Sequence, residues 1–195
     1  NDIGAAWNLE KATWRHHPKM IMELKIERED GEIIKINSDT TWKCCEGPIT
    51  YNHVREGEIY DARLEQKLWN TNEFSDDSWE NAVICPGPGG ILEPMDMLPI
   101  RVVRTLNMTY LGNNVYDTGE NISGWAKIKV KGKQGSVVEL HYCEILTENG
   151  DIDNSHICKS ISGDLKHCDK YILSGDGVEE WEPCFVYHGF RYVKV

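Results

Sequence analysis

The chain has 195 residues, with 21 Lys or Arg against 32 Asp or Glu, so its net charge is −11. This acidic balance and the absence of any basic run exclude nucleic acid as a partner. No stretch reaches the roughly 18 apolar residues of a membrane-spanning helix, and the first residues lack the pattern of a signal peptide, so we expect a soluble chain with no membrane partner.

The cysteines form an odd set without regular spacing: Cys44, Cys45, Cys85, Cys143, Cys158, Cys168 and Cys184. Such a set argues against a disulfide framework and favours reduced, mostly buried thiols. We therefore expect a reducing compartment, with the cytoplasm favoured.

The first part of the chain reads as short strands and turns. Residues 1–17 show no clean period and resemble the tail of a preceding element. Met20–Glu27 alternates apolar and charged residues, and Ile33–Ile36 resumes the pattern after the turn Glu29–Gly31. An Asp-Gly turn between two such runs predicts a β-hairpin, and Thr41–Cys45 predicts a further short strand.

The stretch Gly47–Trp69 concentrates charged and aromatic residues where a strand is expected. Alternate residues of an extended chain share a face, which places Asp61 and Arg63 on one side and Glu58 on the other. Asp61 and Arg63 can therefore form an ion pair. Two interpretations stay open: an ion pair that fixes a turn at the end of a strand, and a polar binding site.

The Gly- and Pro-rich segment Cys85–Leu98 is the best domain boundary, and we place the division between residues 95 and 96. Beyond it, turns separate short apolar runs at the intervals typical of an all-β sandwich, and we expect Phe185 and Phe190 in its core. The predicted strands are Val102–Leu106, Val115–Asp117, Ala126–Val130, Ser136–Tyr142, Lys170–Leu173, Glu182–Tyr187 and Arg191–Val195. The sequence thus predicts an all-β chain of two jelly-roll-like β-sandwich domains, residues 1–95 and 96–195.

The segment Gly150–Asn154 has the Asp-x-Asp pattern of a calcium loop. Counted from Asp151, however, the sixth and twelfth positions hold His156 and Ser162, where an EF-hand needs Gly and Glu. This excludes an EF-hand. We expect a polar hairpin tip instead.

Four residues offer zinc-type ligands in two local groups, His156 with Cys158 and His167 with Cys168. Zinc sites normally show gaps of about two to four residues within each ligand pair, and neither group has one. The spacing therefore argues against a zinc site.

Three strings carry a family resemblance. They are Gly57–Arg63, followed by Trp69 and Asp76–Trp79; Tyr116–Trp125; and Trp181–Val193. In this order and spacing the chain resembles the N-terminal accessory region of bacterial α-L-rhamnosidases, which are inverting glycoside hydrolases. The resemblance implies an N-terminal sandwich and a second, concanavalin-like sandwich. In the family the catalytic acids lie in a large helical barrel that follows them.

This resemblance implies that the chain holds no catalytic residue and no catalytic helical barrel, and that it is inactive alone. Its expected partners are the barrel of the same parent chain and a rhamnose-containing oligosaccharide or glycoside. In some relatives the matching region binds rhamnose through calcium. That implies a carbohydrate site made of Asn52, Glu58, Asp61, Arg63 and Trp69, in which Asn52 and Asp61 bind calcium; no other cofactor is expected.

Three functions therefore remain open. The chain is an accessory scaffold that supports the barrel, a sugar-binding module, or a stand-alone protein-interaction module without a carbohydrate role. Aromatic residues in the closing string favour the scaffold, because they are typical of cores and interfaces. An aromatic platform near polar residues, as at Trp69 and Asn52, favours sugar binding.

Overall fold

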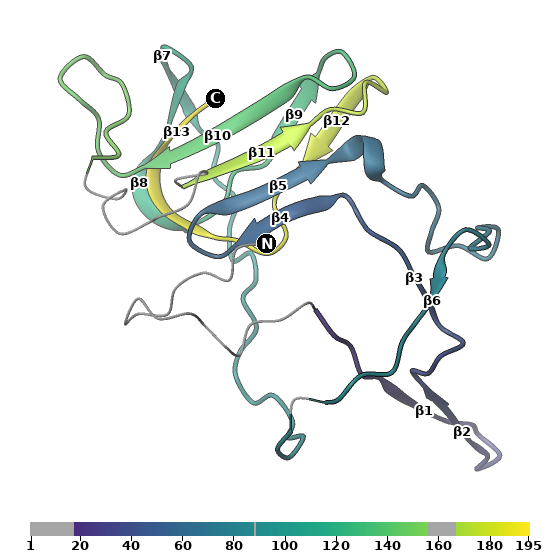
Figure 1. Cartoon of the computed structure of the whole chain (residues 1–195). Helices are drawn as coiled ribbons and strands as arrows, with labels where there is room; N and C mark the ends of the chain where they lie inside the picture. The colour runs from purple at the N-terminus through teal and green to yellow at the C-terminus, as the bar shows by residue number, and fades with distance from the viewer. Residues whose placement is uncertain (1–17, 88, 156–166) are drawn as a thin grey trace. The chain divides into compact units, whose positions relative to one another are not determined.

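The computed structural model describes residues 18–87, 89–155 and 167–195 (Figure 1). Residues 1–17 and the predicted positions His156, Cys158 and Ser162 lie outside this part. The regular elements found in the described part are β-strands and one short 3-10 helix. No helix there has the length and hydropathy to cross a membrane. The predicted all-β class is confirmed.

The chain divides into two compact units. One contains Asn1–Glu46 and Leu68–Pro94, and the other contains Gly47–Lys67 and Met95–Val195. The units do not follow the order of the chain, because Gly47–Lys67 lies in the same unit as Met95–Val195. The reason is strand pairing: Ile59 and Tyr60 pair in parallel register with Lys170 and Tyr171.

The first unit begins with the predicted hairpin, which is confirmed. Strand β1 (Glu23–Glu27) pairs antiparallel with β2 (Ile33–Asn37). Gly31 closes the turn with a φ of +85°, a left-handed conformation that glycine adopts without steric cost. Strand β3 (Lys43–Cys44) pairs with β6 (Glu80–Asn81) in a second two-stranded sheet.

The second unit contains a seven-stranded sheet in the order β4-β5-β11-β10-β13-β8-β7 and a two-stranded sheet, β12-β9 (Figure 1). The 3-10 helix η1 (Ala62–Leu64) directly follows β5. The strand bounds are Ile49–His53 (β4), Gly57–Asp61 (β5), Thr109–Gly112 (β7), Val115–Gly124 (β8), Ile128–Lys131 (β9), Val137–Cys143 (β10), Cys168–Ile172 (β11), Val178–Trp181 (β12) and His188–Lys194 (β13).

The core of the second unit lies between its two sheets. Leu140, Tyr171 and Phe190 contribute from the large sheet, and Trp181 contributes from the small one. The rings of Tyr171 and Trp181 stack with their centroids 5.2 Å apart. Alternate residues of each strand therefore face the opposite layer, which is the arrangement of a β-sandwich.

Two predicted strands are wrong. Val102–Leu106 forms no strand, and Val103 is exposed. Glu182–Tyr187 forms none either, because Pro183 has no backbone N–H and the N–H groups of the next two residues donate to a carboxylate instead of a neighbouring strand. Phe185, expected in the core, is 67 % exposed; Phe190, at 1 %, confirms its prediction.

The cysteines are also more exposed than predicted. In the described ranges the free cysteines Cys44, Cys45, Cys85 and Cys184 are exposed, whereas Cys143 and Cys168 are buried. The prediction that the thiols are mostly buried is therefore wrong for the cysteines in the described ranges, because four of these six are exposed. The expected hairpin tip at Gly150 is confirmed: Leu146 and Ile152 form an antiparallel bridge below it.

Candidate functional site

The predicted ion pair between Asp61 and Arg63 is confirmed. Arg63 donates from Nε to Oδ1 of Asp61 at 2.8 Å and from Nη2 to Oδ2 at 2.6 Å. Asp61 is the last residue of β5 and caps η1, which contains Arg63, so the pair lies where the strand ends. The Asp61 carboxylate also accepts a bond from the Arg63 backbone N–H at 3.1 Å. These bonds from Arg63 lower the pKa of the Asp61 carboxyl. The geometry is that of an ion pair that fixes a turn, and both oxygens already have a cationic partner.

Glu58 is fully buried, and its carboxylate faces backbone donors. It accepts bonds from the N–H of Cys184 at 3.2 Å and of Phe185 at 3.1 Å. The Asn52 amide adds a longer bond of 3.4 Å. Burial raises the pKa of Glu58, although the backbone donors oppose that shift. Glu58 therefore ties β5 to the segment between β12 and β13.

A second buried carboxylate, Asp169, extends this arrangement into a network. It accepts a bond from the Glu58 backbone N–H at 2.9 Å, and His188 Nε2 lies 3.1 Å from its Oδ2. Neither Asp169 nor His188 has an exposed side chain. Tyr142 stacks on His188 with ring centroids 4.1 Å apart. Sequence reasoning missed this network, because Asp169 stands between Cys168 and Lys170 in a mixed segment that gives no local sign of burial.

The residues predicted to bind sugar do not all belong to one unit. Asn52, Glu58, Asp61 and Arg63 belong to the second, and Trp69 belongs to the first. Trp69 is 61 % exposed, as a stacking platform has to be. The carbohydrate and calcium sites therefore stay a prediction.

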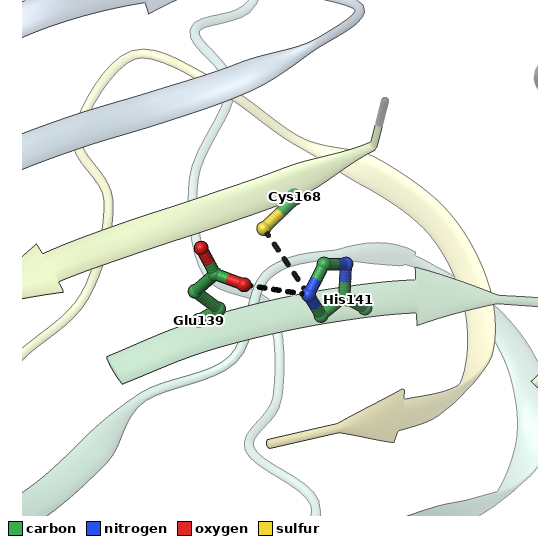
Figure 2. A group of neighbouring side chains, drawn as sticks. All are labelled: Glu139, His141 and Cys168. Carbon is green, nitrogen blue, oxygen red and sulfur yellow. Dashed lines mark hydrogen bonds and ion pairs between the residues drawn. The ribbon is translucent and has the colours of Figure 1, made fainter. Parts of the chain in front are cut away.

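A different set of metal-ligating residues lies on two paired strands (Figure 2). Glu139 and His141 of β10 and Cys168 of β11 place one ligand atom each within 4.8 Å of the others. His167 does not join them, although the sequence groups it with Cys168. Its ring instead packs edge-to-face against the buried His188 ring, with centroids 4.6 Å apart.

Family comparisons cover nearly the whole chain. Residues 2–104 match the model described as the α-L-rhamnosidase N-terminal domain, and residues 108–195 match the bacterial α-L-rhamnosidase concanavalin-like domain. The chain belongs to the α-L-rhamnosidase family. The resemblance in its three strings is thereby confirmed.

Individual α-L-rhamnosidases agree with this assignment. One from Formosa agariphila is 35 % identical over 91 % of this chain and 19 % of its own length. The solved enzyme from Dictyoglumus thermophilum matches with a TM-score of 0.80 and 41 % identity over 89 % of this chain and 20 % of its own. The Streptomyces avermitilis enzyme, solved with L-rhamnose, gives a TM-score of 0.85 and 30 % identity over 98 % of this chain and 19 % of its own. The chain thus spans about a fifth of these relatives.

Proposed function

We propose that this chain is the non-catalytic N-terminal part of a longer α-L-rhamnosidase, in which its β-units support the catalytic part. The observation that carries the proposal is that the chain matches two non-catalytic domains of the family and spans about a fifth of the relatives' length. On this proposal the acid and the base that cleave the rhamnoside belong to the longer chain, and its substrate is a rhamnose-containing glycoside.

The β1–β2 hairpin offers a surface for such support. Leu24 pairs with Ile36 and Ile26 with Ile34, so these four side chains share one face of the hairpin. Leu24, Ile26 and Ile36 are exposed. Charged residues such as Lys25 lie on the opposite face. A contiguous exposed apolar face is typical of an interaction surface, which supports packing against the rest of a longer chain.

The test compares one substitution in two contexts. Ile26→Ser, on the apolar face, and Lys25→Ser, on the charged face, are made in this chain and in a longer α-L-rhamnosidase that contains it. In this chain alone both variants should keep the free energy of unfolding within about 0.5 kcal/mol. In the longer protein Ile26→Ser should lose about 1.5 to 3 kcal/mol, because a packed Ile is exposed to water on unfolding. Equal effects of Ile26→Ser in both contexts would contradict the supporting role.

Carbohydrate binding is the second candidate. The exposed Trp69 indole supports it, because sugar rings stack an apolar face on aromatic planes. The buried Glu58 and the Arg63-paired Asp61 weaken it, since their oxygens already accept hydrogen bonds within the chain. Calcium at Asn52 and Asp61 would have to displace the Arg63 guanidinium.

A further inference from the structure

The outer face of the seven-stranded sheet carries a compact group of three metal-ligating side chains. His141 of β10 stands directly opposite Cys168 of β11 in the antiparallel register, and Glu139 lies two residues before His141 on the same face. Leu140 and Tyr142, which alternate with them, point into the core. The three ligands thus come from two central strands of the sheet and not from a loop.

The distances within the group resemble the edges of a coordination tetrahedron. His141 Nε2 lies 3.1 Å from Glu139 Oε2 and 3.8 Å from Cys168 Sγ (Figure 2). Around a tetrahedral Zn²⁺, with bonds of about 2.0 Å to N or O and 2.3 Å to S, the corresponding edges are about 3.3 and 3.5 Å. These two edges need shifts of only a few tenths of an ångström. The third pair, a Glu139 oxygen and Cys168 Sγ, lies within 4.8 Å and must come to about 3.5 Å for all three atoms to bind one ion.

We propose that Glu139, His141 and Cys168 form a binding site for a borderline-soft divalent cation of the zinc class. One nitrogen, one sulfur and one oxygen ligand suit Zn²⁺, whereas Ca²⁺ and Mg²⁺ require oxygen ligands. The Glu139 and His141 side chains are 42 % and 35 % exposed, so an ion can enter from solvent and keep a water as its fourth ligand.

Neighbouring groups define how the site would work. Lys170 Nζ holds Glu139 Oε1 at 2.7 Å, which leaves Oε2 directed at His141 and orients the carboxylate for binding through one oxygen. The same ammonium repels a cation. In the metal-free chain Cys168 is a thiol, because burial raises its pKa to about 12, and the thiol lies 3.5 Å from the Asp169 carbonyl oxygen. Binding therefore releases the thiol proton to solvent as the thiolate–metal bond forms.

The alternative is an ordinary surface cluster in which Glu139 simply bridges Lys170 and His141. The two interpretations predict different results when the lysine charge is removed. At a metal site Lys170→Gln relieves the repulsion, and the glutamine amide can still donate to the Glu139 carboxylate and keep it oriented, so zinc should bind at least as tightly as to wild type. In an ordinary ion-pair cluster the same substitution creates no metal affinity.

The experiment titrates the purified, reduced and metal-free chain with Zn²⁺, and separately with Co²⁺ as a spectroscopic probe. We expect one Zn²⁺ per chain and, with Co²⁺, a thiolate-to-metal charge-transfer band. His141→Ala and Cys168→Ser should each raise the zinc Kd at least about 10-fold and abolish the band. Cys184→Ser, which removes an exposed thiol outside the cluster, should change neither.

Because Cys168 is buried, Cys168→Ser could fail to fold, and the half-exposed Glu139→Gln and His141→Ala then carry the test. Their folding is checked by circular dichroism before titration. A folded His141→Ala variant that binds Zn²⁺ as tightly as wild type would overturn the proposal. The proposal would also be overturned if the wild-type chain did not bind one Zn²⁺ per chain.

Discussion

Asp169 and His188 meet inside the second unit with 3.1 Å between Oδ2 and Nε2, and neither side chain is exposed. The same carboxylate accepts the Glu58 backbone N–H, so it joins β5, β11 and the start of β13. A buried polar group is stabilising only while all its partners are in place. This network therefore makes the packing of the sandwich depend on one side chain.

Asp169→Ala should lose about 3 to 5 kcal/mol in the free energy of unfolding, because it leaves the Glu58 N–H and His188 Nε2 buried without a partner. Denaturant unfolding measures the loss. Asp151→Ala is the control, since it breaks a partly exposed ion pair with Lys194 and should cost much less. Similar losses for the two variants would show that the Asp169 network does not hold the sandwich together.

The pH dependence of stability should reveal the buried Glu58 carboxyl. Its pKa is higher in the folded chain than its ordinary value of 4.5, so the folded state binds that proton more tightly than the unfolded state. Its contribution to stability is therefore largest at low pH and is lost as the pH rises through the raised pKa. Relative to Glu58→Gln, wild type should lose stability as the pH rises above the ordinary carboxyl value of 4.5. If the free energy of unfolding of wild type instead rose with pH relative to Glu58→Gln, the raised pKa would be contradicted.

Two phenylalanines five residues apart should respond differently to truncation. Phe190 is 1 % exposed and packs on Tyr142, with ring centroids 4.8 Å apart. Phe190→Ala should therefore cost about 3 to 5 kcal/mol. Phe185→Ala should change stability by no more than about 0.5 kcal/mol, because that ring is exposed. Chemical unfolding of both variants measures which one loses more stability. A larger loss for Phe185→Ala than for Phe190→Ala would refute the assignment of the core.

L-Rhamnose should bind no more tightly than about 1 mM, equivalent to about 4 kcal/mol, because the Glu58 and Asp61 oxygens are already engaged. Calorimetric titration with and without a chelator measures this affinity. Heat that disappears with the chelator and with Trp69→Ala would support the predicted calcium and sugar site. Micromolar binding would show that the carboxylates rearrange.

Features set by neighbouring residues were predictable from the sequence. The Asp-Gly turn at Gly31 determines the β1–β2 hairpin, and Asp61 pairs with an arginine two residues away. In both cases the local chain fixes the geometry, so spacing is sufficient information. The all-β class follows from the same short-range alternation.

Features that depend on contacts between distant strands were not predictable. His141 and Cys168 are 27 positions apart and meet only through the register of β10 and β11. The sequence instead groups Cys168 with His167, whose ring lies among buried aromatic rings. The apolar side chain of Phe185 predicts a core strand, but the bond from its backbone N–H to Glu58, 127 positions away, holds that segment outside the sheet. Register and such long-range bonds leave no local pattern.

The most direct test of the central claim is hydrolysis of an aryl α-L-rhamnoside by this chain and by a longer α-L-rhamnosidase that contains it. The proposed non-catalytic role predicts turnover by the longer enzyme and none by this chain, because the acid and base of inverting hydrolysis belong to the longer chain. Turnover by this chain at the rate of the full enzyme, abolished by replacing a single carboxylate within residues 1–195, would contradict the account.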